Sequence, residues 1–170
     1  MRTQREEESI ERVQEALKNI LNINTTKKEY QYDGTDLSAT GVTGVGLIEV
    51  KERLLNYPEF INYLNEGLIL EKKKYDELIE NNGLYLNYFD FKFCQVILIW
   101  DARKIDLSTL KKKWCKQSTE FENKKYVLKD VYYTYLNNTC VRLINYNGEW
   151  ERISIDKIYQ KLNNLMEENN

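Results

Sequence analysis

Apolar residues recur every three or four positions near the start of the chain. Between Glu6 and Leu21 the apolar positions are Ile10, Val13, Leu17, Ile20 and Leu21. This spacing is typical of one face of an amphipathic helix, and the glutamates at its start suit the helix dipole. The pattern predicts a helix over residues 6–21, with Glu11 at the border of the apolar stripe.

The next segments predict a β-hairpin. Residues 24–28 read as a polar break, and residues 29–40 are rich in Tyr and Thr, which favour strands. Three glycines between Gly41 and Gly46 supply a turn, and the apolar strand 47–53 follows directly. An antiparallel return of this kind brings Asp33 or Asp36 opposite the region of Glu49.

The rest of the chain alternates between helical and β-prone segments. Helices are predicted from Asn56–Pro58 onward, over 66–80 with an end at Asn81–Gly83, over 107–115 and over 154–166. Strands are predicted over 84–88, 93–100, 125–136 and 140–146. The sequence therefore predicts an α/β protein, and its 170 residues fit a single domain over 1–170.

Composition narrows the class of protein. Hydrophobic residues make up 42% of the chain and charged residues 31%, as in folded globular proteins. The longest apolar run, near residues 94–100, is far shorter than the ~20 residues of a membrane helix, and the charged N-terminus is unlike a signal peptide. We therefore expect no membrane association and a cytoplasmic location.

The residue types present also limit the chemistry. The chain has no histidine, so Ser-His-Asp hydrolysis, Cys-His chemistry and His-ligated metals are excluded. The three cysteines, Cys94, Cys115 and Cys140, lack the paired spacing of zinc sites. Any metal would be a hard cation held by oxygen atoms. A net charge of −2 gives no general attraction to nucleic acid, so phosphate binding would have to be local.

One strand carries two opposite charges. Side chains alternate along a strand, so Glu49 and Lys51 share one face of the strand 47–53. Inside a sheet, a carboxylate and an ammonium group are costly to bury unless something pairs with both, and a divalent metal with a water or phosphate would do so. The alternative is an ordinary half-exposed strand, whose ion pair would contribute less than ~1 kcal/mol.

Asp36, a glycine-rich hairpin and Glu49-x-Lys51 together resemble the active-site signature of the PD-(D/E)XK nuclease superfamily. The resemblance extends to the leading helix, the segment Ile48–Arg53, the helical segment Leu70–Leu78 and the apolar strands that follow, as in small nucleases of phage-type genomes. It implies a restriction-endonuclease-like fold: a central mixed β-sheet flanked by helices, here with extra C-terminal strands and a C-terminal helix. It also implies the cytoplasm of a bacterial or phage-infected cell.

The resemblance implies hydrolysis of DNA phosphodiester bonds with Mg²⁺ or Mn²⁺. Asp36 and Glu49 would bind the metal together with the backbone carbonyl of Val50. The family's Pro-Asp pair is absent here, and Asp33 is the alternative ligand to Asp36. In a regular strand these two aspartates point to opposite faces, although a bulge at Gly34 would bring them to one side.

The remaining roles also follow from the resemblance. Lys51 would position or deprotonate the attacking water and stabilise the transition state. Glu11 would reach the metal through a water molecule. Lys74, Tyr75 and Arg53 would contact the substrate.

Two other kinds of function fit the same sequence. A non-catalytic module of the same fold would bind nucleic acid or protein through the lysine clusters 72–74 and 111–113. An assembly module would use exposed tyrosines as an interface. The expected partner is DNA. The near-neutral charge fits a partner protein that recruits the chain to DNA, and a homodimer is the alternative assembly.

Overall fold

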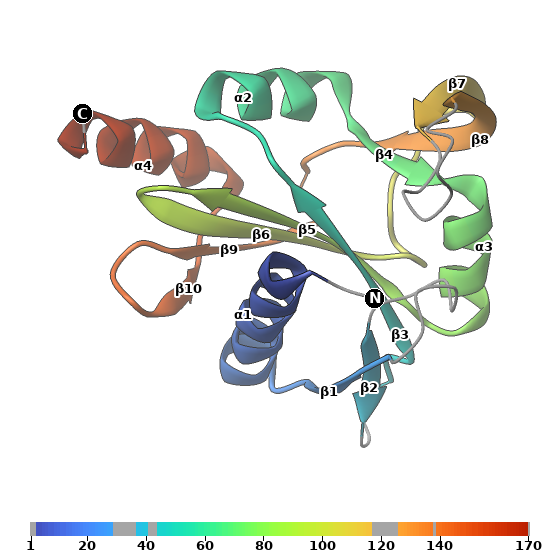
Figure 1. Ribbon diagram of the computed structural model, residues 1–170, viewed down its shortest axis with the longest axis horizontal. Helices are drawn as coiled ribbons and strands as arrows, with labels where there is room; N and C mark the ends of the chain where they lie inside the picture. The colour runs from blue at the N-terminus through green and yellow to red at the C-terminus, as the bar shows by residue number, and fades with distance from the viewer. Residues whose placement is uncertain (1–2, 29–36, 41–43, 117–125, 138, 170) are drawn as a thin grey trace.

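The computed structural model describes residues 3–28, 37–40, 44–116, 126–137 and 139–169. These residues form four helices and ten strands (Figure 1). The helices are α1 (Gln4–Leu21), α2 (Tyr57–Glu66), α3 (Lys72–Glu80) and α4 (Ile155–Glu168). The predicted α/β class is confirmed.

The larger sheet contains seven described strands. They are β1 (Asn24–Lys27), β2 (Leu37–Thr40), β3 (Leu47–Arg53), β5 (Leu84–Phe91), β6 (Cys94–Asp101), β9 (Val141–Asn145) and β10 (Trp150–Arg152), and they lie in that order across the sheet. β3 and β5 are parallel, and all other neighbours are antiparallel. A parallel pair needs a long crossover, and here α2, β4 (Leu68–Glu71) and α3 supply it.

The smaller sheet has β8 (Tyr126–Thr134) in its centre, between β4 and β7 (Lys111–Lys116). β4 pairs only with the last four residues of β8, Val131 to Thr134, whereas β7 pairs with Tyr126 to Val131. Past Val131 the two strands continue beyond β4 as a two-stranded arm, and residues 111–115 of β7 with residues 126–130 of β8 are called the ribbon below.

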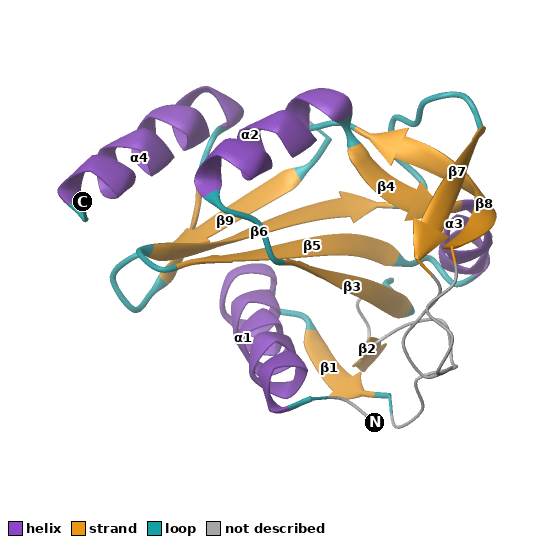
Figure 2. Cartoon of the chain, turned by 45° about the horizontal axis from the view of Figure 1, so that its top comes forward, coloured by secondary structure: helices purple, strands orange, loops and turns teal. Residues whose placement is uncertain are grey.

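Helices cover both faces of the larger sheet. On one face, Val13 and Leu17 of α1 pack with Ile48 of β3, and all three are fully buried. On the other face, Phe60 of α2 and Leu162 of α4 share a second core with β5 and β6. Figure 2 shows α1 alone on its side, with α2 and α4 on the other and α3 beside the ribbon.

Several predicted elements are confirmed. The helix predicted over 6–21 is α1, and it begins at Gln4 because Thr3 and Glu6 form a capping box. Asn56 caps α2 in the same way with Glu59. The strand 47–53, the hairpin formed by β5 and β6, the strands near 125–136 and 140–146, and the C-terminal helix are present.

Three predictions were wrong. Residues 111–116 form β7 instead of the end of a helix, because their backbone pairs with β8, and this tertiary pairing outweighs the helix propensity of lysine. Residues 68–71 form β4 instead of helix, since alternation buries Leu68 and Leu70. Residues 24–27 form β1 instead of a polar break, with Thr25 and Thr26 paired to β2. The short strand β10 was not predicted.

The described part of the hairpin agrees with the expected antiparallel return: Leu37 pairs with Ile48, and Ser38 with Leu47. Most of the strand predicted over 29–40 and the start of the glycine turn lie outside the described residues. Among the described helices, none is long and apolar enough to cross a membrane.

Candidate functional site

The candidate site is centred on Glu49 in the middle of the larger sheet. Alternation along β3 sends Ile48 into the core beneath α1 and Glu49 to the opposite face. There Glu49 lies beside Tyr85 of β5 in the parallel register. Glu49 is only 3% exposed, so its carboxylate is held away from bulk water. A buried carboxylate of this kind needs partners.

Two lysines provide those partners. Lys51 Nζ lies 3.2 Å from one carboxylate oxygen of Glu49, and Lys74 Nζ lies 3.8 Å from the other. Lys51 comes from the same strand, whereas Lys74 comes from α3. The predicted sharing of a face by Glu49 and Lys51 is therefore present, and the structure adds Lys74 to the pair.

Close packing of α3 against β3 positions Lys74. The backbone N–H of Gly46, just before β3, donates a hydrogen bond to the carbonyl of Asn82, just after α3. A Cβ atom at Gly46 would overlap the carbonyl oxygen of Asn81. Glycine at this position lets the end of α3 approach the start of the charged strand.

The electrostatics of the site keep Lys51 charged. Burial alone would lower the pKa of Lys51, but the charge of Glu49 and its hydrogen bond raise the pKa above its ordinary value. The charge of Glu71 acts in the same direction. Lys51 is therefore an ammonium ion at neutral pH.

Arg53, predicted to contact substrate, ties β3 to its neighbours. Its guanidinium donates hydrogen bonds to Asn87 Oδ1 at 2.9 Å, to the hydroxyl of Tyr85 at 3.0 Å and to the carbonyl of Ile69 at 3.2 Å. Ile69 belongs to β4, so Arg53 links the two sheets. A substrate contact by Arg53 stays a prediction.

Sequence reasoning missed Asn87. This residue is fully buried, lies beside Lys51 in the register of β5, and its Nδ2 has no hydrogen-bond partner within the described chain. The sequence feature that could have identified it is a single amide side chain in the otherwise apolar and aromatic segment 84–89. An unsatisfied buried donor next to a charged site is a candidate contact for a bound group.

A surface hollow of about 560 Å³ adjoins the site. It is lined by Glu71, Lys72, Lys73, Lys74, Asp76, Lys129 and Asp130. Glu71 and Lys129 form an ion pair of 2.9 Å across it, which joins β4 to β8. Since Lys74 also contacts Glu49, the hollow connects the charged strand with the smaller sheet. Glu71 and Lys129 were not identified from the sequence, because their pairing depends on the β4–β8 register.

Tyr75, the other predicted substrate contact on α3, packs against the smaller sheet. Its ring meets the ring of Tyr132 edge-on, with centroids 5.2 Å apart. Tyr75 is half-buried, so part of its surface lies at the boundary between α3 and β8.

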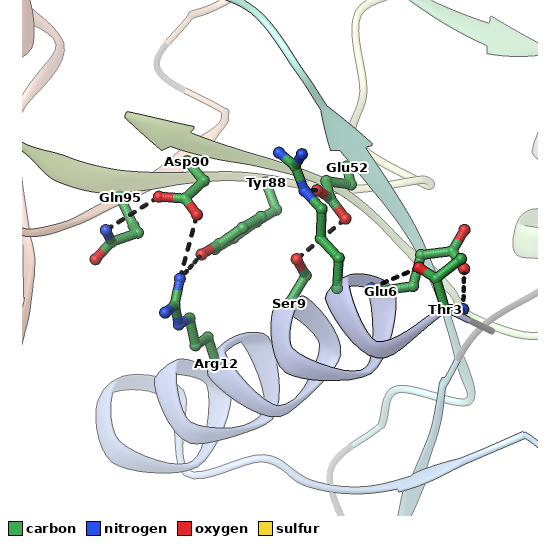
Figure 3. A network of polar contacts seen from close by, with 9 residues as sticks. Thr3, Glu6, Ser9, Arg12, Glu52, Tyr88, Asp90 and Gln95 are labelled. Carbon is green, nitrogen blue, oxygen red and sulfur yellow. Dashed lines mark hydrogen bonds and ion pairs between the residues drawn. The ribbon is translucent and has the colours of Figure 1, made fainter. Parts of the chain in front are cut away.

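The opposite face of β3 has a separate polar network beneath α1 (Figure 3). Glu52 accepts a hydrogen bond of 3.0 Å from Ser9 and pairs with Arg5 at 2.7 Å. Nearby, Arg12 donates to the hydroxyl of Tyr88 and pairs with Asp90. Glu52 therefore connects α1 to the sheet through these contacts, on the face opposite Glu49.

The structure does not bring Glu11 to Glu49. Lys27 of β1 pairs with Glu11 at 3.0 Å and with Glu7 at 2.7 Å. Lys27 lies beside Leu37, which lies beside Ile48, and residues directly opposite each other share a face of the sheet. Glu11 thus lies on the α1 side, where Ile48 is buried, and its water-mediated metal contact stays a prediction.

The other predicted metal ligands are less fully described. Asp33 and Asp36 lie outside the described residues. Val50, whose carbonyl was predicted to bind metal, lies between Glu49 and Lys51, and its side chain packs on the α1 side of the sheet. Among the described residues, no group of three or more Cys, Asp or Glu side chains is arranged to hold a metal ion.

Comparison with known proteins adds no family to this geometry. No protein-family model matches the chain, and no curated protein and no solved structure is significantly similar to it.

Proposed function

We propose that the chain is a divalent-metal-dependent nuclease that hydrolyses DNA phosphodiester bonds at Glu49, Lys51 and Lys74. The observation that carries the proposal is the buried carboxylate of Glu49 between two lysine ammonium groups. An isolated salt bridge on a half-exposed strand would leave Glu49 in water. Here the carboxylate is 3% exposed, and its partner Lys74 lines a hollow that holds four lysines and three carboxylates.

The order of elements supports a restriction-endonuclease-like fold for this site. A leading helix, an antiparallel hairpin, the strand with Glu49 and Lys51, a helix with Lys74 and Tyr75, and then apolar strands follow one another as in the resemblance drawn from the sequence. The parallel pairing of β3 with β5 leaves the charged strand inside the sheet, with neighbours on both sides.

Two oxygen donors of the site suit a hard cation. Glu49 offers a buried carboxylate and Val50 a backbone carbonyl, which are donors that Mg²⁺ and Mn²⁺ accept. We assign the second carboxylate to Asp36, with Asp33 as the alternative. Leu37, which follows Asp36 in sequence, pairs with Ile48, which precedes Glu49. When bound, the metal would lower the pKa of a water molecule and stabilise charge on the phosphate.

The lysines have separate roles in this proposal. Lys51 keeps its positive charge and places it where negative charge develops on the scissile phosphate. Lys74, whose side chain is 21% exposed, holds the approaching phosphate at the edge of the hollow. On substrate binding, part of the contact of each lysine with Glu49 would give way to contact with a phosphate oxygen.

A non-catalytic nucleic-acid-binding module is the second candidate. The observation in its favour is that each carboxylate oxygen of Glu49 has a lysine partner. In such a module Glu49 would serve only to hold two lysines in place for binding phosphate.

The test is a cleavage assay on single-stranded, duplex and branched DNA with Mg²⁺, Mn²⁺ or EDTA. We expect cleavage of at least one form with either metal and none with EDTA. Replacing Lys51 by alanine should lower the rate by about 100-fold or more, because one cation aimed at the transition state is lost. Lys104→Ala, an exposed lysine in the turn after β6, is the matched control and should keep the rate. DNA that stays intact under every condition while still binding would support the non-catalytic module.

A further inference from the structure

The ribbon exposes large apolar side chains. Trp114 is 64% exposed, Tyr126 67% and Leu128 45%. Trp114 lies directly opposite Leu128, and alternation along β8 places Tyr126 on the same face. The other two tryptophans, Trp100 and Trp150, are buried. The aromatic face of the ribbon, formed by Trp114, Tyr126 and Leu128, is therefore not part of either core.

The ribbon also carries net positive charge in a slightly acidic chain. Its four lysines and single aspartate give it a net charge of +3, whereas the whole chain has −2. Lys112 pairs with Asp130, and Lys129 with Glu71. Lys111 and Lys113 each lie 5.9 Å from the ring centroid of Tyr133 and form no ion pair with any other described residue. Alternation places Lys111 and Lys113 with Tyr133 on the face opposite Trp114, and Lys112 on the same face as Trp114. All three lysines belong to β7, the edge strand of the smaller sheet, so positive charge lines the edge of the aromatic face.

We propose that the ribbon binds an unpaired DNA strand along its edge strand β7, with bases stacked on Trp114 and Tyr126 and the phosphate backbone crossing the β7 edge toward Lys111 and Lys113. This inference rests on the proposed nuclease function and names its substrate class: DNA that is single-stranded or has a single-stranded branch. Aromatic rings stack on bases of any sequence, and lysines attract the backbone. Lysine is depleted at protein–protein interfaces, so the charge of the ribbon favours nucleic acid over a protein partner.

The aromatic face leads toward the candidate active site. Residues 126, 128, 130 and 132 of β8 lie on one face, and the ring of Tyr132 packs against Tyr75, next to Lys74. Trp114 is opposite Leu128, four residues before Tyr132, which corresponds to about 13 Å along the strand. Figure 2 shows the ribbon and α3 at the same end of the molecule. A strand stacked on Trp114 would pass the lysine-lined hollow before it reaches Glu49.

The test separates binding from cleavage by measuring tryptophan fluorescence in EDTA. Because Trp100 and Trp150 are buried, Trp114 is the tryptophan that an oligonucleotide can reach. We expect a short oligo(dT) to quench the fluorescence. We expect Trp114→Ala to weaken oligo(dT) binding, measured by anisotropy of a labelled strand, by about 10-fold. The same variant should change the affinity for a duplex of equal length by less than twofold.

Charge variants sharpen the test. Replacing Lys111 and Lys113 together by alanine should weaken oligo(dT) binding and reduce its salt dependence. Lys157→Ala removes an exposed lysine from α4, at the opposite end of the molecule in Figure 1, and should leave binding unchanged. Circular dichroism checks that each variant is folded, which we expect because all three lysines lie outside the cores.

Three results would overturn the inference. The first is unquenched fluorescence together with equal oligo(dT) affinity of Trp114→Ala and the unmodified protein. The second is a loss of duplex affinity in Trp114→Ala as large as its loss of oligo(dT) affinity, which would make the face a general DNA contact. The third is a concentration-dependent dimer that Trp114→Ala abolishes, which would assign the face to a second copy of the chain. If oligo(dT) stacks on Trp114 but no DNA is cut with Mg²⁺ or Mn²⁺, the ribbon inference stands and the nuclease proposal fails.

Discussion

The two sheets place charged and apolar side chains in opposite ways. In the larger sheet, apolar residues face two cores and the charged Glu49 is enclosed between neighbouring strands. In the smaller sheet, Trp114 and Tyr126 lie in solvent among lysines. Each sheet thus departs from the usual placement in one respect, and each departure marks a surface that we propose to act on DNA.

The difference shows what each region can tolerate. A buried carboxylate needs charged partners, and Lys51 and Lys74 are such partners of Glu49, so the geometry of the larger sheet fixes its position. An exposed tryptophan contributes little to folding, so the ribbon can change without loss of the core. We therefore expect substitutions in the larger sheet to affect stability and reaction rate, and substitutions in the ribbon to affect binding.

The strongest test of this difference in stability is to truncate one apolar residue in each region. Phe60 is fully buried, with ring centroids 4.8 Å from Phe89 and 5.2 Å from Phe91. Phe60→Ala should lower the free energy of unfolding by about 3–5 kcal/mol, because it leaves a cavity. Leu128→Ala in the ribbon should change it by about 0.5 kcal/mol or less. Urea titration measures both, and equal losses would show that the ribbon belongs to the core.

Arg53 tests the junction between the two sheets. Arg53→Leu removes the hydrogen bonds to Asn87 and to Ile69 of β4, and it leaves the buried oxygen of Asn87 with only a long hydrogen bond of 3.5 Å from the Tyr85 hydroxyl. We expect a loss of about 1–3 kcal/mol in the free energy of unfolding. Arg152→Leu, at an exposed position of β10, is the control and should change it by about 0.5 kcal/mol or less. Identical stabilities of the two variants would mean that Arg53 does not join the sheets.

The pH dependence of stability gives the smallest expected effect. Burial raises the pKa of Cys140 to about 12. Because the folded pKa lies above that of the unfolded thiol, the contribution of Cys140 is complete below about pH 8.5 and is lost as the pH rises toward the folded value. From pH 8 to 9.5, Cys140→Ala should lose about 1 kcal/mol less stability than the unmodified protein. Parallel stability curves for the two proteins would contradict this result.

The sequence predicted the scaffold better than the smaller sheet. Helical spacing in α1 and alternation in β3 are local patterns, so their elements and the shared face of Glu49 and Lys51 could be predicted. β4 and β7 could not, because Leu68–Glu71 and Lys111–Lys116 become strands only by pairing with β8. The contact of Lys74 with Glu49 has the same origin, since it depends on how α3 packs against Gly46.

The central claim is that the buried carboxylate of Glu49 supports metal-dependent hydrolysis. Glu52 provides a matched comparison, because it lies on the same strand but faces α1, where Ser9 and Arg5 hold it. The most direct measurement is the initial rate of DNA cleavage in Mn²⁺ by Glu49→Gln and Glu52→Gln. We predict that Glu49→Gln loses about 100-fold or more of the rate while Glu52→Gln stays within about fivefold of the unmodified protein. Equal rates for the two variants would contradict the account.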